Sequence, residues 1–358
     1  MTEKNGQYLV YIGTYTNGAS EGIYVYRLDL ASGDLEYSSK ATGVENPSFL
    51  NIHPSRRYLY AVNENGDGEV SAFAIDAQSG ALTFLNRQST HGSAPCHLSI
   101  DATGQCLLVA NYGSGNVCAY AIHNDGTLGE ASTNIQHRGS SIDENRQQGP
   151  HAHSITPDAA NRFAFAADLG TDQVMIYRLD PNAAQLAPND PPHAQVAGGQ
   201  GPRHLDFHPN GKYAYLINEI GNTFTAFTYD ADSGALDEMH TVSTLPEAYT
   251  ETSHTADVHV HPSGKFVYGS NRGHDSIAIA DIDPDSGRLS NVRCESTRGK
   301  NPRNFALDPT GAYLFAANMG SDNIFTFCID QETGNLEATG QETQVPTPVC
   351  IKMMPVAD

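Results

Sequence analysis

Apolar and polar residues alternate along most of the chain in short runs, and one arrangement of these runs recurs. From Gly201 to Glu219 the sequence GPRHLDFHPNGKYAYLINE contains two alternating segments separated by a tight turn. Period-two alternation rich in β-branched and aromatic residues is typical of strands, and no window has helical spacing. The segment therefore predicts an antiparallel hairpin that brings Arg203 and Glu219 to the same end.

This hairpin is repeated along the chain. Related segments begin at Asn46, Ala94, Gly149, His254 and Asn301, which makes six complete hairpins together with the one at Gly201. A third apolar segment follows each hairpin, and a second turn of the type DADSGAL occurs seven times. Self-similarity at a fixed period indicates a repeat architecture.

The two ends of the chain supply the missing hairpin. The segment YLVYIGTYT (8–16) matches the second strand of the unit, and TPVCIKM (347–353) matches the first. Seven units in 358 residues give about 51 residues each, close to the ~40 to 50 of four-stranded propeller blades. We predict an all-β, seven-bladed β-propeller with four-stranded blades. The C-terminal strand joins the N-terminal blade and closes a single domain over residues 1–358, which removes exposed sheet edges.

The charge of the chain limits which partners it can bind, and its cysteine pattern limits the chemistry of its thiols. Asp and Glu outnumber Lys and Arg by 41 to 20, a formal charge of −21, which disfavours nucleic acid and anionic membranes. A small anionic ligand remains compatible if a few arginines share one pocket. The apolar run in MTEKNGQYLVYIG is too short for a signal peptide or a membrane span, so we expect a cytoplasmic protein. Six cysteines without a CxxC pair predict buried, reduced thiols.

Candidate chemistry gathers at one end of the predicted hairpins. In a propeller the first strand of each blade lines the central channel and the second runs back beside it, so first-strand starts and second-strand ends share a face. The polar residues at these positions are Asn63, Glu64, Asn111, Tyr112, His151, His153, Asp168, Arg203, Asn218, Glu219, Asn271, Arg272, Arg303 and Asn318. For the asparagines two interpretations stay open, turn capping and substrate binding. The polar connections 136–149 and 245–253 lead onto this face and are expected to overhang it.

Four residues from three adjacent blades are the expected catalytic group: His151, Arg203, Glu219 and Arg272. A histidine and a carboxylate suit acid–base work near neutral pH, and arginines suit a carboxylate, a phosphate or an oxyanion. An ion pair between blades is the alternative for Glu219 and Arg272. The residues assigned to substrate binding are His153, Asn63, Glu64, Asn111, Tyr112, Asn271 and Arg303.

Metal and cofactor motifs are missing from the sequence. It has no HExxH, no EF-hand loop, no Cys/His cluster and no Gly-rich phosphate loop that opens a helix. We therefore expect neither a catalytic metal nor a cofactor. The expected partner is a small anionic molecule, and the expected assembly is a monomer or a weak homo-oligomer.

The hairpins resemble a known family. GPRHLDFHPNGKYAYLINE, TADVHVHPSGKFVYGSNR and the Gly-x-His entry at Gly149 are similar to segments of the propeller-type 6-phosphogluconolactonases and of the related fungal carboxy-muconate cyclase. The resemblance covers essentially the whole chain. It implies a metal-independent hydrolase of 6-phospho-D-glucono-1,5-lactone in the pentose phosphate pathway.

The resemblance also implies a site made of a His, an Arg, a Glu and a second Arg. These fall on His151, Arg203, Glu219 and Arg272, although His153 offers a second histidine in the same blade. Two other functions stay open at this point. One is the lactonising or delactonising of a muconate-type dicarboxylate, and the other is a non-catalytic propeller that binds proteins, which would need a large apolar patch on one face.

Overall fold

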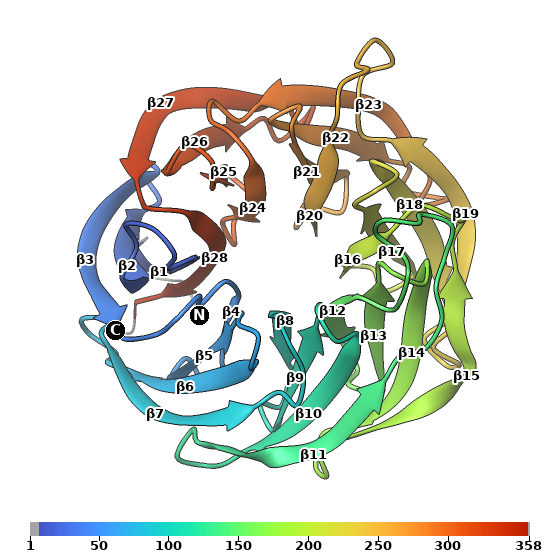
Figure 1. Cartoon of the computed structure of the whole chain (residues 1–358). Helices are drawn as coiled ribbons and strands as arrows, with labels where there is room; N and C mark the ends of the chain where they lie inside the picture. The colour runs from blue at the N-terminus through green and yellow to red at the C-terminus, as the bar shows by residue number, and fades with distance from the viewer. Residues whose placement is uncertain (1–6, 357–358) are drawn as a thin grey trace.

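The computed structural model describes residues 7–356 and shows a ring of blades around a central channel (Figure 1). The strands form seven antiparallel sheets of four strands each. The C-terminal strand β28 (Pro348–Pro355) pairs with β1 (Gln7–Thr14) and completes the first blade. The predicted seven-bladed propeller and its closure are therefore confirmed.

The strands nearest the channel carry the start of each hairpin. Besides β28 these are β4 (Leu50–Ile52), β8 (Pro95–Ile100), β12 (Ala152–Pro157), β16 (Pro202–Phe207), β20 (His254–Val260) and β24 (Pro302–Leu307). The second strands run back beside them. Besides β1 these are β5 (Tyr58–Asn63), β9 (Cys106–Asn111), β13 (Phe163–Asp168), β17 (Tyr213–Asn218), β21 (Phe266–Arg272) and β25 (Tyr313–Asn318).

The two outer strands of each blade complete the sheets. The third strands are β2 (Gly22–Asp29), β6 (Glu69–Ile75), β10 (Asn116–Ile122), β14 (Gln173–Asp180), β18 (Thr223–Tyr229), β22 (Ser276–Ile282) and β26 (Asn323–Ile329). The outermost strands are β3 (Asp34–Thr42), β7 (Leu82–Ser89), β11 (Leu128–Gln136), β15 (Gln185–Gln195), β19 (Leu236–Ser243), β23 (Leu289–Ser296) and β27 (Leu336–Gln344). Within residues 7–356 no helix is long and apolar enough to span a membrane.

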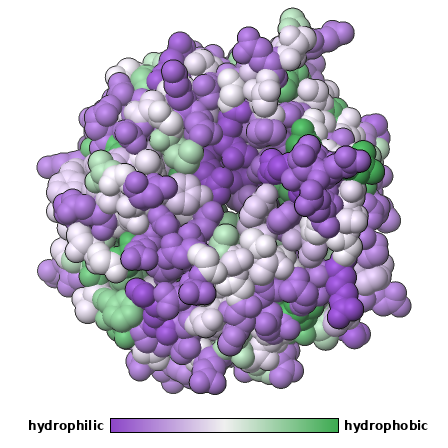
Figure 2. Space-filling model, in the orientation of Figure 1, coloured by the Kyte–Doolittle hydropathy of each residue, from purple (hydrophilic) through white to green (hydrophobic). Residues whose placement is uncertain are grey.

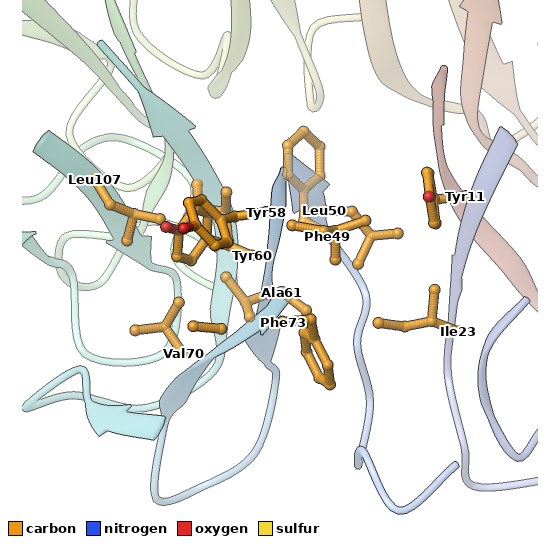
Figure 3. Close-up of a cluster of buried hydrophobic side chains, with 14 of the residues drawn as sticks. Tyr11, Ile23, Phe49, Leu50, Tyr58, Tyr60, Ala61, Val70, Phe73 and Leu107 are labelled. Atoms are coloured by element: carbon orange, nitrogen blue, oxygen red, sulfur yellow. The ribbon is translucent and has the colours of Figure 1, made fainter. Parts of the chain in front are cut away.

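The core lies between neighbouring blades, because the second and third strands are apolar on both faces. Figure 3 shows one such cluster, in which Tyr11 and Ile23 of the first blade face Leu50 and Phe73 of the second. Tyrosines of the second strands also reach the next blade. Tyr11 donates to the carbonyl of Gly80 at 3.1 Å, and equivalent bonds join Tyr60 to Gly126, Tyr215 to Gly287 and Tyr268 to Gly334. The recurring turn glycines are thus part of the contact between blades.

Candidate active site

A β-bulge at the start of the inner hairpins decides which side chains face the channel. In the fifth blade the pairing passes from Pro202 with Asn218 to His204 with Ile217, so that Arg203 has no partner on β17. Such a bulge leaves one residue outside the ladder and redirects its side chain. The residues left unpaired in the same way in other blades are Cys96, His153, Arg303 and Val349.

The second set of site residues stands at or directly after the end of the second strands. Its members around the ring include Tyr15, Glu64, Tyr112, Glu219 and Arg272. Together with the bulge residues they line most of a pocket of about 340 Å³, whose full lining is Tyr15, Glu64, Cys96, Tyr112, Arg146, His153, Glu219, His254, Arg272 and Arg303. Figure 2 shows hydrophilic residues gathered around the central hollow of the face drawn in Figure 1.

Glu219 is buried among three guanidinium groups. Its Oε2 lies 2.9 Å from Arg203 Nε and 2.8 Å from Arg272 Nη2. Its Oε1 lies 2.7 Å from Nη2 of Arg146. The Nε2 of His153 is 3.8 Å from Oε2. Three cations therefore share one carboxylate, and a histidine stands beside them.

These contacts fix the protonation states. Burial opposes ionisation of Glu219, but the charges of Arg272 and Arg203 outweigh it and hold the carboxyl pKa well below its usual range. Burial, with the neighbouring charges of Arg272 and Arg303, lowers the pKa of Arg203 to about 10, so the guanidinium stays charged at neutral pH. Burial and the charge of Arg203 lower the pKa of His153 well below its ordinary value. The site thus holds a carboxylate next to a neutral imidazole.

The opposite side of the pocket is built around Glu64. The Tyr15 hydroxyl donates to both carboxylate oxygens at 3.0 Å, and the Ser48 hydroxyl donates to Oε2. Arg303 is farther away, with Nη2 3.9 Å from Glu64 Oε1, and its guanidinium stacks over the Tyr15 ring at 5.5 Å. Burial raises the pKa of Tyr15, so this hydroxyl remains a neutral donor.

Comparison with known proteins assigns the family. Residues 9–353 match the family described as Lactonase, 7-bladed beta-propeller. The chain is 38% identical over 351 residues to the 6-phosphogluconolactonase of Bacillus subtilis, covering 97% of this chain and 99% of that one. The chain belongs to the seven-bladed β-propeller lactonase family.

Solved structures agree with this assignment. A crystal structure of a Bacteroides fragilis protein superposes on this lactonase-family chain with a TM-score of 0.93 at 38% identity, covering 99% of both chains. A periplasmic gluconolactonase of Pseudomonas aeruginosa superposes with a TM-score of 0.93 at 33% identity, covering 98% of this chain and 100% of that one.

The lactonase pocket contains most of the residues expected from the sequence. Glu64, Tyr112, His153, Glu219, Arg272 and Arg303 line it. Arg203 is not part of the lining; its side chain is 2% exposed, contacts Glu219 and borders a small void shared with Cys96 and Arg303. The pairing between Glu219 and Arg272 does join two blades, so the ion-pair interpretation and a place in the site hold together.

Of the four residues expected to be catalytic, His151 neither lines the pocket nor contacts the Glu219 cluster, whereas Arg203 is outside the lining but paired with Glu219. The Nδ1 of His151 lies 2.8 Å from the Tyr112 carbonyl, and its ring stacks on the Tyr112 ring. The sequence motif aligns His151 with Arg203, but the pairing of Ala152 with Asp168 makes His153 the bulge residue. The histidine in the pocket is therefore two residues further along the chain.

The strand-end asparagines also lie outside the pocket lining. Asn63, Asn111 and Asn271 are buried, and their amide nitrogens donate to the backbone carbonyls of Glu45, Thr90 and Thr244, respectively. They tie the strand end to the connection before it. The turn-capping interpretation fits these contacts, and the assignment of the three residues to substrate binding stays a prediction.

Four pocket residues are missing from the sequence-based set: Tyr15, Cys96, Arg146 and His254. Tyr15 and Cys96 occupy the same repeat positions as Glu219 and Arg203, so a strict alignment of the repeats would have found them. Arg146 comes from the connection 136–149, which overhangs the pocket as expected. None of residues 245–253 lines the pocket, although His254 directly after them does.

A buried hydrogen-bond network contacts Arg203 through His204 and Asp257. Its Nη1 donates to Nε2 of His204 at 3.2 Å, and Nδ1 of His204 donates to Asp257 at 2.7 Å. Asp257 also accepts from His259 and from Asn304. Among residues 7–356 no group of three or more His, Cys, Asp or Glu is placed to hold a metal ion.

Proposed function

We propose that the protein hydrolyses 6-phospho-D-glucono-1,5-lactone to 6-phosphogluconate, a step of the pentose phosphate pathway, without a metal ion. The charge of the pocket is the observation that carries this proposal. Four arginines surround two glutamates, an excess of two positive charges in a protein of net charge −21. A phosphomonoester carries −1.5 to −2 charges at neutral pH. The pocket therefore complements a phosphorylated lactone, the substrate class named for the Bacillus subtilis relative.

The proposed chemistry uses the groups that face this pocket. Water adds to the lactone carbonyl carbon and passes a proton to Glu219. Arg272 and Arg303 stabilise the oxyanion that forms, because preorganised cations in a partly buried site favour developing negative charge. The bond between the carbonyl carbon and the ring oxygen then breaks, the ring oxygen takes up the proton, and the new carboxylic acid releases one.

His153 stands beside this reaction as a neutral hydrogen-bonding group for the substrate. Its Nε2 is close to Glu219, and its Nδ1 is 3.5 Å from the Cys96 thiol. The low imidazole pKa keeps this ring uncharged throughout the physiological range. The neutral ring therefore adds no charge to the arginine cluster.

Proton release from freshly generated 6-phosphogluconolactone tests this function. We expect a rate above spontaneous hydrolysis that a chelator leaves unchanged, and Arg272→Ala should lower kcat/KM on the order of 100-fold, as for loss of an oxyanion donor. Arg272 is preferred to Arg203 because it is 16% exposed against 2%. Arg138→Ala, an exposed change outside the pocket, is the control. An unchanged rate in Arg272→Ala would contradict the proposed mechanism. Faster turnover of a muconate-type lactone than of 6-phosphogluconolactone would contradict the proposed substrate.

A further inference from the structure

Arg146 differs from the other arginines of the pocket. Arg203, Arg272 and Arg303 come from strands, and their side chains are 2%, 16% and 17% exposed. Arg146 comes from the connection between β11 and β12 and is 33% exposed. It is the cation that an incoming anion meets first.

The connection that carries Arg146 is well anchored. The Asp143 carboxylate accepts hydrogen bonds from the backbone N–H groups of Asn145 and Arg146 at 2.9 and 3.1 Å. Gln147 is fully buried, and its Nε2 donates to the carbonyl of Leu169 at 2.8 Å. Figure 1 shows the connection passing in front of β16 and β17, the hairpin that ends at Glu219. The backbone is therefore fixed, and the guanidinium is presented over the pocket.

The two oxygens of Glu219 are held differently. Oε2 accepts from Arg203 and Arg272, whereas Oε1 accepts from Arg146. The same Nη2 of Arg146 also donates to the Tyr112 hydroxyl at 3.1 Å. If Arg146 leaves, Glu219 keeps two buried cations, so no unpaired buried charge results. Oε1 can thus be uncovered without breaking the ion cluster.

We propose that Arg146 is the residue that recognises the phosphate group and, at rest, covers Oε1 of Glu219. A phosphomonoester offers several charged oxygens in place of one carboxylate oxygen, and it draws the guanidinium into a charge-assisted, bidentate contact. Oε1 is then free to accept the proton of the attacking water. This inference rests on the proposed function, and it makes substrate phosphate both a binding group and a trigger.

Withdrawal of one cation also changes the basicity of Glu219. The side-chain hydrogen bond from Arg146 is among the contacts that hold the carboxyl pKa low. Moving that charge away raises the affinity of the carboxylate for a proton. Phosphorylated lactones therefore meet a stronger base than unphosphorylated lactones do.

The test compares Arg146→Met with Arg138→Met on two substrates, 6-phosphogluconolactone and glucono-1,5-lactone, after subtraction of spontaneous hydrolysis. Arg138 is exposed, lies in the same connection and is outside the pocket lining. For Arg146→Met we expect kcat/KM on the phosphorylated lactone to fall about 10- to 100-fold, mainly through KM, as for loss of a charged hydrogen bond. On the unphosphorylated lactone kcat/KM should rise, because Oε1 is uncovered. Arg138→Met should match the wild type on both.

Three outcomes oppose the inference. An equal loss on both lactones, or no change on either, overturns it. A loss confined to the phosphorylated lactone, without a gain on the other, supports phosphate recognition and overturns the covering role.

A binding measurement separates this inference from the proposed function. Calorimetric titration with inorganic phosphate should give a Kd about tenfold or more weaker for Arg146→Met than for Arg138→Met. If the wild type hydrolyses neither lactone, the proposed function fails while this difference still supports the phosphate site. Equal Kd values overturn the phosphate site even if the lactone is hydrolysed.

Discussion

The two carboxylates of the pocket occupy the same repeat position and differ in their neighbours. Glu64 follows β5 and Glu219 follows β17, each directly after a buried asparagine. Glu64 accepts hydrogen bonds from two hydroxyl groups, whereas Glu219 contacts three guanidinium groups. The propeller backbone thus decides where a carboxylate stands, and the adjacent blades decide its charge environment. We infer that Glu219 belongs to the reacting half of the pocket, together with the phosphate-recognising Arg146, and Glu64 to the half that positions Arg303.

The sharpest test of this comparison is a matched pair, Glu219→Gln and Glu64→Gln. Glu219→Gln leaves Arg203, with 2% of its side chain exposed, without its counter-ion. Removing one partner of a buried ion pair costs about 3 to 5 kcal/mol of folding free energy. We also expect kcat to fall on the order of 100-fold or more, because the proton acceptor is lost.

Glu64→Gln should cost about 1 kcal/mol, since an amide oxygen still accepts from the hydroxyls of Tyr15 and Ser48. Urea unfolding and steady-state kinetics measure both quantities. Equal losses of stability in the two variants would show that the two environments are energetically alike.

The next test concerns the two histidines beside the reacting half. His153→Asn removes an imidazole that lines the pocket near Glu219, and we expect kcat/KM to fall about 10-fold, as for loss of a hydrogen bond to the substrate. His151→Asn changes a side chain outside the pocket lining and should lower kcat/KM less than threefold. Kinetics on the proposed substrate measure both. The reverse order of effects would restore the assignment of the catalytic histidine to His151.

A smaller effect is expected on the pH dependence of stability, and it concerns the residues that follow the two arginines at the bulges, Arg203 and Arg303. His204 follows Arg203, Asn304 follows Arg303, and both contact Asp257. Burial and the charge of Arg203 lower the pKa of His204 to about 4. An unfolded chain binds a proton at this histidine near pH 6.5, and the folded protein does not, so stability is full above pH 6.5 and falls on acidification.

Between pH 7 and pH 5 this linkage amounts to about 2 kcal/mol. His204→Asn should reduce the acid sensitivity of the free energy of unfolding by that amount, which urea titrations at the two pH values measure. An unchanged pH dependence would show that His204 titrates alike in the folded and unfolded chains. His259→Asn is a control with the opposite expected sign. It should increase the acid sensitivity of the free energy of unfolding, because Asp257 outweighs burial and raises the pKa of His259.

The sequence was sufficient to predict the propeller and its closure, because alternation and repeat spacing report directly on strands and blades. The structure also brings Arg203, Glu219 and Arg272 together, as expected for strand ends on one face. The sequence favoured His151 over His153 as the catalytic histidine, because Gly-Pro-His aligns with Gly-Pro-Arg of the fifth blade. The strand pairing is shifted by two residues relative to this alignment, so His153 takes the position of Arg203. The position of a β-bulge depends on local backbone hydrogen bonding, which the amino-acid sequence does not show. Arg146 was missed because no repeat fixes the side chains of an irregular connection.

The pairing of β28 with β1 means that the two halves of the pocket depend differently on the C-terminal end of the chain. The Glu219 half uses residues 146 to 272, which run from the connection into the fourth blade to the sixth blade. The Glu64 half needs Arg303 stacked on Tyr15, and β28 lies between the strands that carry them, in contact with both β1 and β24. The residues of the reacting half are therefore synthesised well before the last strand, whereas the Glu64 half is complete only once that strand is in place. Removal of β28 should accordingly disturb the contact between Arg303 and Tyr15 before it disturbs the cluster around Glu219.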